Sequence, residues 1–187
     1  MGQVLETNFD YEAPSSLLPM GDSDGYQHLY LEGTGKPASD STQFNWLVEG
    51  KFYTLTAATK ANDELLFARV GANDPEFNLR RDAALMFRRK DVGDTLFVSV
   101  IEPHGLYSPV SELSVNPNSN ISSVKVVHDS DAYTAVIIEN LENQSSIFIV
   151  ANRDASVSQR HQLTIGGKQY SWQGPYYLGE ESMRGLR

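Results

Sequence analysis

Hydrophobic and polar residues alternate along most of this chain, in short segments separated by residues that favour turns. Residues 42–48 show the pattern most clearly, because large apolar side chains occupy every second position. Residues 51–58 repeat it after Glu49 and Gly50, a pair that suits a tight turn. A period of two with aromatic and β-branched residues is typical of strands with one buried face. The two segments therefore predict a β-hairpin.

The same pattern predicts about eleven strands at short spacing and little or no helix. Residues 83–89 also fit a short helix, but a strand is favoured because alternate residues are apolar. Gly166 and Gly167 predict a two-residue turn between the last two strands, because glycine readily adopts positive φ. The predicted strands are residues 26–32, 42–48, 51–58, 65–70, 83–89, 95–102, 122–128, 133–139, 146–150, 162–165 and 168–172.

Many short strands without helices pack as two layers, so the predicted fold class is all-β, an antiparallel two-layer β-sandwich. Residues 1–25 are rich in proline, glycine and serine, and we expect them to be an irregular N-terminal segment. Residues 26–187 show no linker and are expected to form a single domain. The first residues lack the basic and apolar regions of a signal peptide, and we expect the natural chain to begin upstream of them.

Composition removes several classes of function. The net charge is -9 over 187 residues, which argues against nucleic acid as a partner. There are no cysteines, so disulfides, thiolate nucleophiles and cysteine-ligated zinc are excluded. The four histidines have no metal-binding spacing, and neither a metal site nor a cofactor is predicted. No apolar run approaches the length of a membrane span.

The charge is uneven along the chain. Residues 69–90, which we call the basic island, hold six cationic side chains against three carboxylates. Such a stretch on an acidic protein could meet an anionic ligand, and arginine forks bind carboxylates with two hydrogen bonds. The alternative is that these cations form ion pairs within the protein, with Arg80 or Arg81 closing onto Asp74 or Glu76. The cationic residues are Arg69, Arg80, Arg81, Arg88, Arg89 and Lys90.

A second candidate feature follows the most apolar segment of the chain. Residues 102–105 read Glu-Pro-His-Gly and predict a sharp turn at a strand end, where a sheet can hold a functional side chain still. His104 could there act as a proton shuttle or as an anion ligand. The alternative is that Pro103 and Gly105 build the turn while Glu102 and His104 pair locally.

Four ordered blocks carry a resemblance to a known family. They are GYQHLYLE at 25–32, FNWLVEGKFYTLT at 44–56, LLFARVGANDPEFNLRR at 65–81 and FVSVIEPHGLYSPVSE at 97–112. In this order they resemble the C-terminal β-domain of oligoalginate lyases of polysaccharide lyase family 17, in the heparinase II/III-like class. The resemblance covers about residues 10–150 and is weaker beyond Asn152.

The resemblance implies an exo-acting enzyme of a bacterial periplasm or cytoplasm, which cleaves alginate oligosaccharides by β-elimination. In this family a base abstracts the C5 proton, an acid protonates O4 and polar groups neutralise the uronate carboxylate. The residues that do so lie in an N-terminal α/α-toroid and the first part of the β-region, so no catalytic residue is assigned to this chain. The resemblance thus implies a toroid of the same polypeptide as partner, and a fragment that is inactive alone.

Contacts with the sugar, if the domain makes them, are expected through the basic island or through aromatic rings. Two other functions stay open, an independent carbohydrate-binding β-sandwich module and a purely structural interaction domain. A face that packs on a missing toroid would be apolar, which also makes a homo-oligomer an expected form of the isolated chain. The substrate-binding candidates are Arg69, Arg80, Arg81, His104 and Tyr107; the further rings that could stack on sugar are Tyr26, Tyr30, Trp46 and Trp172.

Overall fold

The computed structural model describes residues 3–7, 11–12, 19–23, 25–71 and 82–181. In these residues the chain is almost entirely antiparallel β-structure, which confirms the predicted fold class, with one short 3-10 helix, η1 (Tyr26–His28). Among them, no helix has the length and apolar character needed to cross a membrane. The strands are β1 (Gln3–Thr7), β2 (Tyr11–Glu12), β3 (Leu29–Gly35), β4 (Ser41–Val48), β5 (Lys51–Ala58), β6 (Asp63–Val70), β7 (Asp82–Arg89), β8 (Val98–Ser108), β9 (Leu113–Val115), β10 (Ile121–Asp129), β11 (Tyr133–Asn140), β12 (Ser145–Ala151), β13 (Arg160–Ile165), β14 (Lys168–Gln173) and β15 (Tyr176–Glu181).

Contacts within the chain divide it into two compact units. Unit 1 comprises Met1–Phe97 with Ile101–Ser119, and unit 2 comprises Val98–Val100 with Asn120–Arg187. The division falls inside β8, so no linker composition marks it in the sequence. That residues 26–187 form a single domain stays a prediction.

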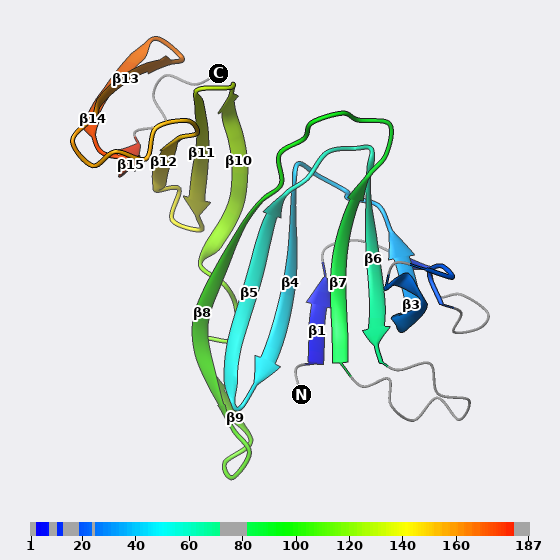
Figure 1. Ribbon diagram of the computed structural model, residues 1–187. Helices are drawn as coiled ribbons and strands as arrows, with labels where there is room; N and C mark the ends of the chain where they lie inside the picture. Colours follow the sequence, from blue (N-terminus) through cyan, green and yellow to red (C-terminus); the bar gives the residue numbers. More distant parts are fainter. Residues whose placement is uncertain (1–2, 8–10, 13–18, 24, 72–81, 182–187) are drawn as a thin grey trace. The chain divides into compact units, whose positions relative to one another are not determined.

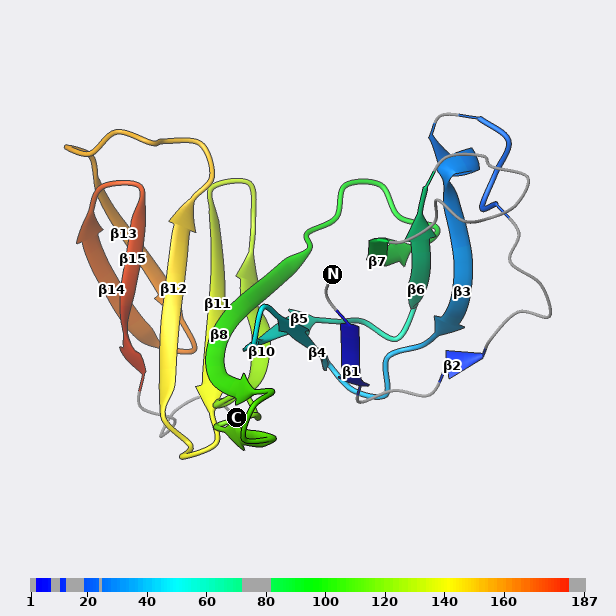
Figure 2. The same ribbon diagram turned by 90° about the horizontal axis from the view of Figure 1, so that it is seen from below.

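Unit 1 is a sandwich of two antiparallel sheets (Figure 1 and Figure 2). The strand order is β1-β4-β5-β8-β9 in the first sheet and β2-β3-β6-β7 in the second. Phe44 of β4 and Leu65 of β6 are fully buried between them. The ring of Phe44 meets those of Phe67 and Phe87 edge-on, at 5.7 Å between centroids in each pair. Burying each such side chain stabilises the fold by about 1.5–3 kcal/mol, so the second sheet is held chiefly over β4.

The two predicted hairpins are confirmed. Strands β4 and β5 pair along their whole length, and so do β13 and β14. The turn residues Glu49 and Gly50 have φ of 49° and 75°, and Gly166 and Gly167 have φ of 56° and 83°. Two consecutive residues with positive φ match the right-handed twist of the strands that they join. Local turn chemistry is therefore enough to fix both connections.

Unit 2 contains the four-stranded sheet β10-β11-β12-β15 and the hairpin β13-β14. Every second residue of β12 is buried, as expected for a strand with one face in a core. Ile147 and Ile149 of that strand pack with Ala135 of β11 and Trp172 of β14. The core of this unit is thus formed between its larger sheet and its hairpin.

Some strands differ from the prediction. Residues 1–25, expected to be irregular, include β1 and β2, which pair with β4 and β3. The strand expected over 26–32 begins only at Leu29, because Tyr26–His28 forms η1 after Gly25, whose φ is 90°. Strands β9 and β15 were not predicted, and they pair with β8 and β12. The described part of the chain therefore holds fifteen strands against the eleven expected, because edge strands form through pairing with a neighbouring strand rather than through their own sequence pattern.

Candidate functional site

The structure describes Arg69, His104 and Tyr107 of the five predicted substrate-binding residues. Arg80 and Arg81 lie outside the described residues, so the predictions made for them stay predictions. Arg69 belongs to β6 in the second sheet of unit 1, whereas His104 and Tyr107 belong to β8 in the first sheet. The three residues are thus spread over two layers.

Arg69 is engaged by a carboxylate of the neighbouring strand. Its Nε donates to Oε1 of Glu32 on β3 at 2.8 Å, and about a third of each side chain is exposed. The pairing register brings Tyr30 opposite Arg69, which places Glu32 within reach of the guanidinium. The positive charge is therefore largely compensated before any ligand arrives.

The other described cations of the basic island are also ion-paired. Arg88 and Lys90 both contact Glu64, at 2.5 Å and 2.7 Å. Hydrogen bonds from Lys90 first and Arg88 second hold the pKa of Glu64 below its ordinary range. Arg89 is paired with Asp63 in the protein interior. For these residues the structure supports the alternative of internal ion pairs over a binding site for anions.

His104 lies inside a strand rather than at a turn, so the predicted turn at 102–105 is wrong. Strand β8 runs through Pro103 without interruption. The glycine is required for a different reason: a Cβ on Gly105 would lie 2.0 Å from the backbone oxygen of Asn116. The Glu-Pro-His-Gly sequence therefore marks a close approach of two backbones, which sequence reasoning took for a turn.

Both ring nitrogens of His104 have partners within the protein. Nε2 lies 2.8 Å from Oγ1 of Thr54 on β5, and Nδ1 lies 2.9 Å from the backbone oxygen of Asn116. A carbonyl oxygen only accepts, so Nδ1 carries a hydrogen and donates it. Oγ1 of Thr54 is also within hydrogen-bond distance of Oδ1 of Asn45, and the ring of Phe52 stacks on the imidazole at 6.1 Å. This arrangement ties three segments together and leaves neither nitrogen for a substrate.

Tyr107 and Glu102 of β8 make further contacts with neighbouring segments of unit 1. The backbone nitrogen of Tyr107 donates to the oxygen of Gly50 at 2.8 Å, which holds the β4-β5 turn against β8. Glu102 accepts a hydrogen bond from the hydroxyl of Ser119. The described contacts around His104 are therefore those of a structural junction.

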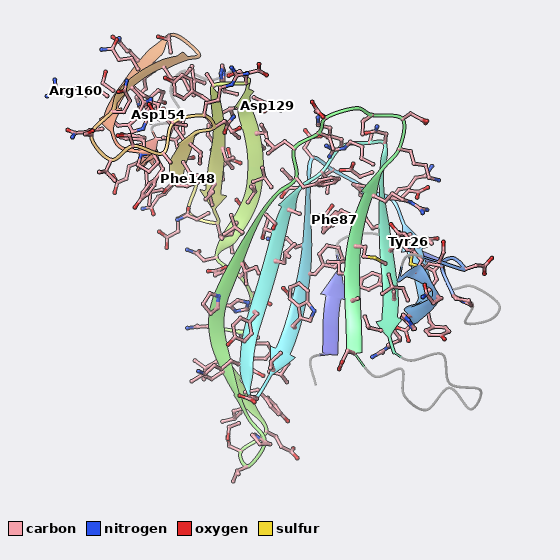
Figure 3. The ribbon with its side chains drawn as sticks, in the orientation of Figure 1. Tyr26, Phe87, Asp129, Phe148, Asp154 and Arg160 are labelled. Carbon is pink, nitrogen blue, oxygen red and sulfur yellow. The ribbon has the colours of Figure 1, made fainter. Side chains whose placement is uncertain are left out.

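The aromatic residues proposed to stack on sugar do not form a platform. Tyr30 and Trp172 are buried, so the prediction is wrong for both. Trp46 and Tyr107 are half-buried, and Trp46 packs against the core of unit 1. Tyr26 is exposed, but it lies in η1 at the edge of unit 1 (Figure 3). The rings named from the sequence therefore give no support to an independent carbohydrate-binding module, which needs neighbouring exposed rings.

Trp172 has a structural role that sequence reasoning missed. It stacks on His161 at 5.2 Å between ring centroids, and Tyr133 meets both rings edge-on. The hydroxyl of Tyr133 lies 3.3 Å from Nδ1 of His161. His161 and Trp172 are paired across the β13-β14 hairpin. The predicted hairpin therefore contained the information needed to place these two rings together. Elsewhere in the described part of the chain, no group of three histidine, aspartate or glutamate side chains could hold a metal ion.

Comparison with known proteins identifies where such a domain occurs. No protein-family model matches the chain. An alginate lyase of Stenotrophomonas maltophilia (strain K279a) is 36% identical over 176 residues, which cover 94% of this chain and 24% of the relative. The chain is homologous to a segment of alginate lyases. An exo-oligoalginate lyase of Saccharophagus degradans (strain 2-40) is 31% identical over 177 residues, or 92% of this chain and 24% of that lyase.

The resemblance to oligoalginate lyases is thereby confirmed, and the match is wider than the sequence blocks suggested. The resemblance was expected to cover about residues 10–150, whereas the alignment with either lyase extends over more than nine-tenths of the chain. The chain spans about a quarter of the length of these two lyases. The alignments with both lyases therefore include most of unit 1 and most of unit 2.

Proposed function

We propose that this chain is the C-terminal β-domain of an exo-acting oligoalginate lyase of the heparinase II/III-like class. The observation that carries the proposal is the alignment of 94% and 92% of the chain with about a quarter of two lyases, one of them named as exo-acting on oligoalginate. The substrate of the whole enzyme is then an alginate oligosaccharide, cleaved by β-elimination. Its place is a bacterial periplasm or cytoplasm.

We infer further that the domain scaffolds a catalytic toroid of the same polypeptide and does not cleave alginate alone. β-Elimination requires a base, an acid and a group that neutralises the uronate carboxylate, all positioned around one sugar. His104 has both nitrogens engaged by Thr54 and Asn116, and Arg69 is paired with Glu32. His104 and Arg69 are the described candidates whose side chains could act in catalysis, and these contacts support a structural role for both.

A reconstitution experiment tests the proposal. The isolated chain is incubated with alginate oligomers, alone and together with the remaining three quarters of the Stenotrophomonas lyase as a separate polypeptide. Product is followed by the absorbance of the unsaturated uronate. The expected result is no turnover by the chain alone and turnover by the mixture above that of the larger polypeptide alone. Robust turnover by the chain alone, or a mixture no more active than the larger polypeptide, contradicts the proposal.

A further inference from the structure

The β8-β9 hairpin of unit 1 exposes an unusual group of large aliphatic side chains. We call them the aliphatic stripe: Ile101, Leu106, Leu113 and Val115, which are 63%, 57%, 65% and 60% exposed. Leu106 pairs directly with Val115, and Leu113 lies two residues before Val115 on the same face of β9. Exposed aliphatic residues normally occur singly on the surface of a protein that works as a monomer.

The geometry of β8 shows on which face of the first sheet the stripe lies. His104 contacts the side chain of Thr54, so His104 is on the Thr54 face. Ile101 precedes His104 by three residues and therefore points to the opposite face. Exposed and half-buried residues alternate along β8 except at His104 and Gly105, which are both half-buried, so the alternation shifts by one position there. This irregularity is typical of a β-bulge, and it keeps Leu106 on the face of Ile101.

That face is the one that forms the core of unit 1. Leu55 and Thr54 are consecutive on β5, so their side chains point to opposite faces, and Leu55 packs in the core cluster around Phe44. The second sheet covers this face where Phe67 and Phe87 pack on Phe44. In Figure 1, β3, β6 and β7 lie on the side of β1 and β4 that is away from β8 and β9, and in Figure 2 they lie on the side away from β8. The aliphatic stripe is thus a continuation of the core face beyond the layer that covers it.

We propose that the aliphatic stripe is the surface on which the rest of the lyase polypeptide docks, where it completes the second layer of unit 1. This inference rests on the proposed function. The two lyases are about four times as long as this chain, so most of their polypeptide is available to cover the face. Pro103 and Ser108 are the other residues of β8 on this face near the stripe, so an apolar partner fits it better than a charged one. A second copy is disfavoured by a net charge of -9 on each chain.

A double substitution tests the surface without removing strand propensity. Leu106→Thr with Leu113→Thr replaces two stripe residues by β-branched polar ones. Leu141→Thr is the matched control, because Leu141 is 64% exposed but lies after β11, in unit 2. Binding to the remaining three quarters of the Stenotrophomonas lyase is measured by calorimetry, after circular dichroism and thermal unfolding confirm that each variant is folded. The double variant is expected to bind at least about ten-fold more weakly, and the control within about two-fold of the unsubstituted chain.

The outcomes separate this inference from the proposed function. Equal affinity of the double variant and the unsubstituted chain, with lyase activity restored by both, overturns the stripe as docking surface and leaves the proposed function standing. A dimer of the isolated chain that the double variant abolishes assigns the stripe to a second copy and overturns the proposed occupant. If the unsubstituted chain neither binds the larger polypeptide nor increases its activity, the proposed function fails and this inference fails with it.

Discussion

Asp63 and Arg89 face each other across β6 and β7 as a two-pronged ion pair that is almost wholly buried. Nε and Nη2 of Arg89 lie 2.5 Å and 2.8 Å from the two carboxylate oxygens, and the side chains are 2% and 0% exposed. Nη1 of Arg89 also donates to Thr95 and to the backbone oxygen of Leu96. The pair therefore joins two strands to the segment that leads into β8.

Removing the arginine should be far more damaging than removing an exposed neighbour. Arg89→Met leaves the Asp63 carboxylate buried without its partner, and we expect the free energy of unfolding to fall by about 3–5 kcal/mol. Arg88→Met is the matched control, because Arg88 is 48% exposed and its loss is expected to cost at most about 1 kcal/mol. Urea unfolding followed by tryptophan fluorescence measures both. Equal losses for the two variants would show that the buried pair has no special role.

Gly105 should tolerate no side chain. In Gly105→Ala the new methyl group would overlap the backbone of Asn116, so either β8 or the segment after β9 must move. We expect a loss of about 1–3 kcal/mol or more in the free energy of unfolding. Gly93→Ala is the control, because a Cβ at Gly93 meets no atom within 4 Å. A stable Gly105→Ala variant with unchanged amide chemical shifts around Asn116 would contradict the close approach.

His104 should matter for stability and not for chemistry. His104→Ala removes the links to Thr54 and Asn116, and we expect the free energy of unfolding to fall by about 1–3 kcal/mol. In the reconstituted lyase, kcat at a temperature where the variant is folded is expected to change by less than about two-fold, whereas losing a general base typically costs about 100-fold or more.

His128→Ala provides the comparison for that variant. Nε2 of His128 contacts the hydroxyl of Ser130, only two residues away in the sequence, at 3.1 Å, so the loss of this side chain should have a smaller effect on stability. A fall in kcat of about 100-fold in folded His104→Ala, with KM unchanged, would assign His104 to the catalytic site and reject its structural role.

Acid should reduce the contribution of Glu64 to the free energy of unfolding. Its pKa is held below the ordinary glutamate value of about 4.3 by Lys90 and Arg88, so the carboxylate stabilises the fold above that value. As the pH falls through the lowered pKa, Glu64 becomes protonated and the contribution is lost. The difference in stability between the unsubstituted chain and Glu64→Gln should thus be present at neutral pH and vanish in acid.

Urea midpoints from neutral pH to about pH 3 give this difference, and added salt should reduce it because the pairs are partly exposed. Glu142→Gln, at an exposed position after β11, serves as control. A difference between the unsubstituted chain and Glu64→Gln that grows on acidification would contradict the lowered pKa.

The sequence correctly predicted the structural features that depend on residues close together in the chain. The β4-β5 and β13-β14 hairpins follow from alternation and from the turn residues Glu49, Gly50, Gly166 and Gly167, all of which act locally. The family resemblance also survived, because it rests on four ordered blocks rather than on one motif. Strands β1 and β15 escaped prediction because their pairing partners are distant in the sequence.

The contacts of the candidate site residues could not be predicted, because they also depend on residues that are distant in the sequence. Arg69 is 37 positions from its partner Glu32, and His104 is 50 positions from Thr54. Only strand order and register bring these groups together, and neither can be read from a single sequence. The local sequence around an arginine does not show whether its partner is a carboxylate on a neighbouring strand or a bound substrate. The sequence of the basic island was therefore compatible with both interpretations.

The position of β8 affects how the two units can be separated by truncating the gene. Val98–Val100 belongs with unit 2 and Ile101–Ser108 with unit 1, yet one uninterrupted run of backbone carries both. A cut in the loop before β8 deprives unit 1 of an interior strand of its larger sheet, and a cut after β9 takes a short piece from unit 2. A cut at either loop therefore leaves one of the two units without part of its chain, so a truncated protein should keep both units together.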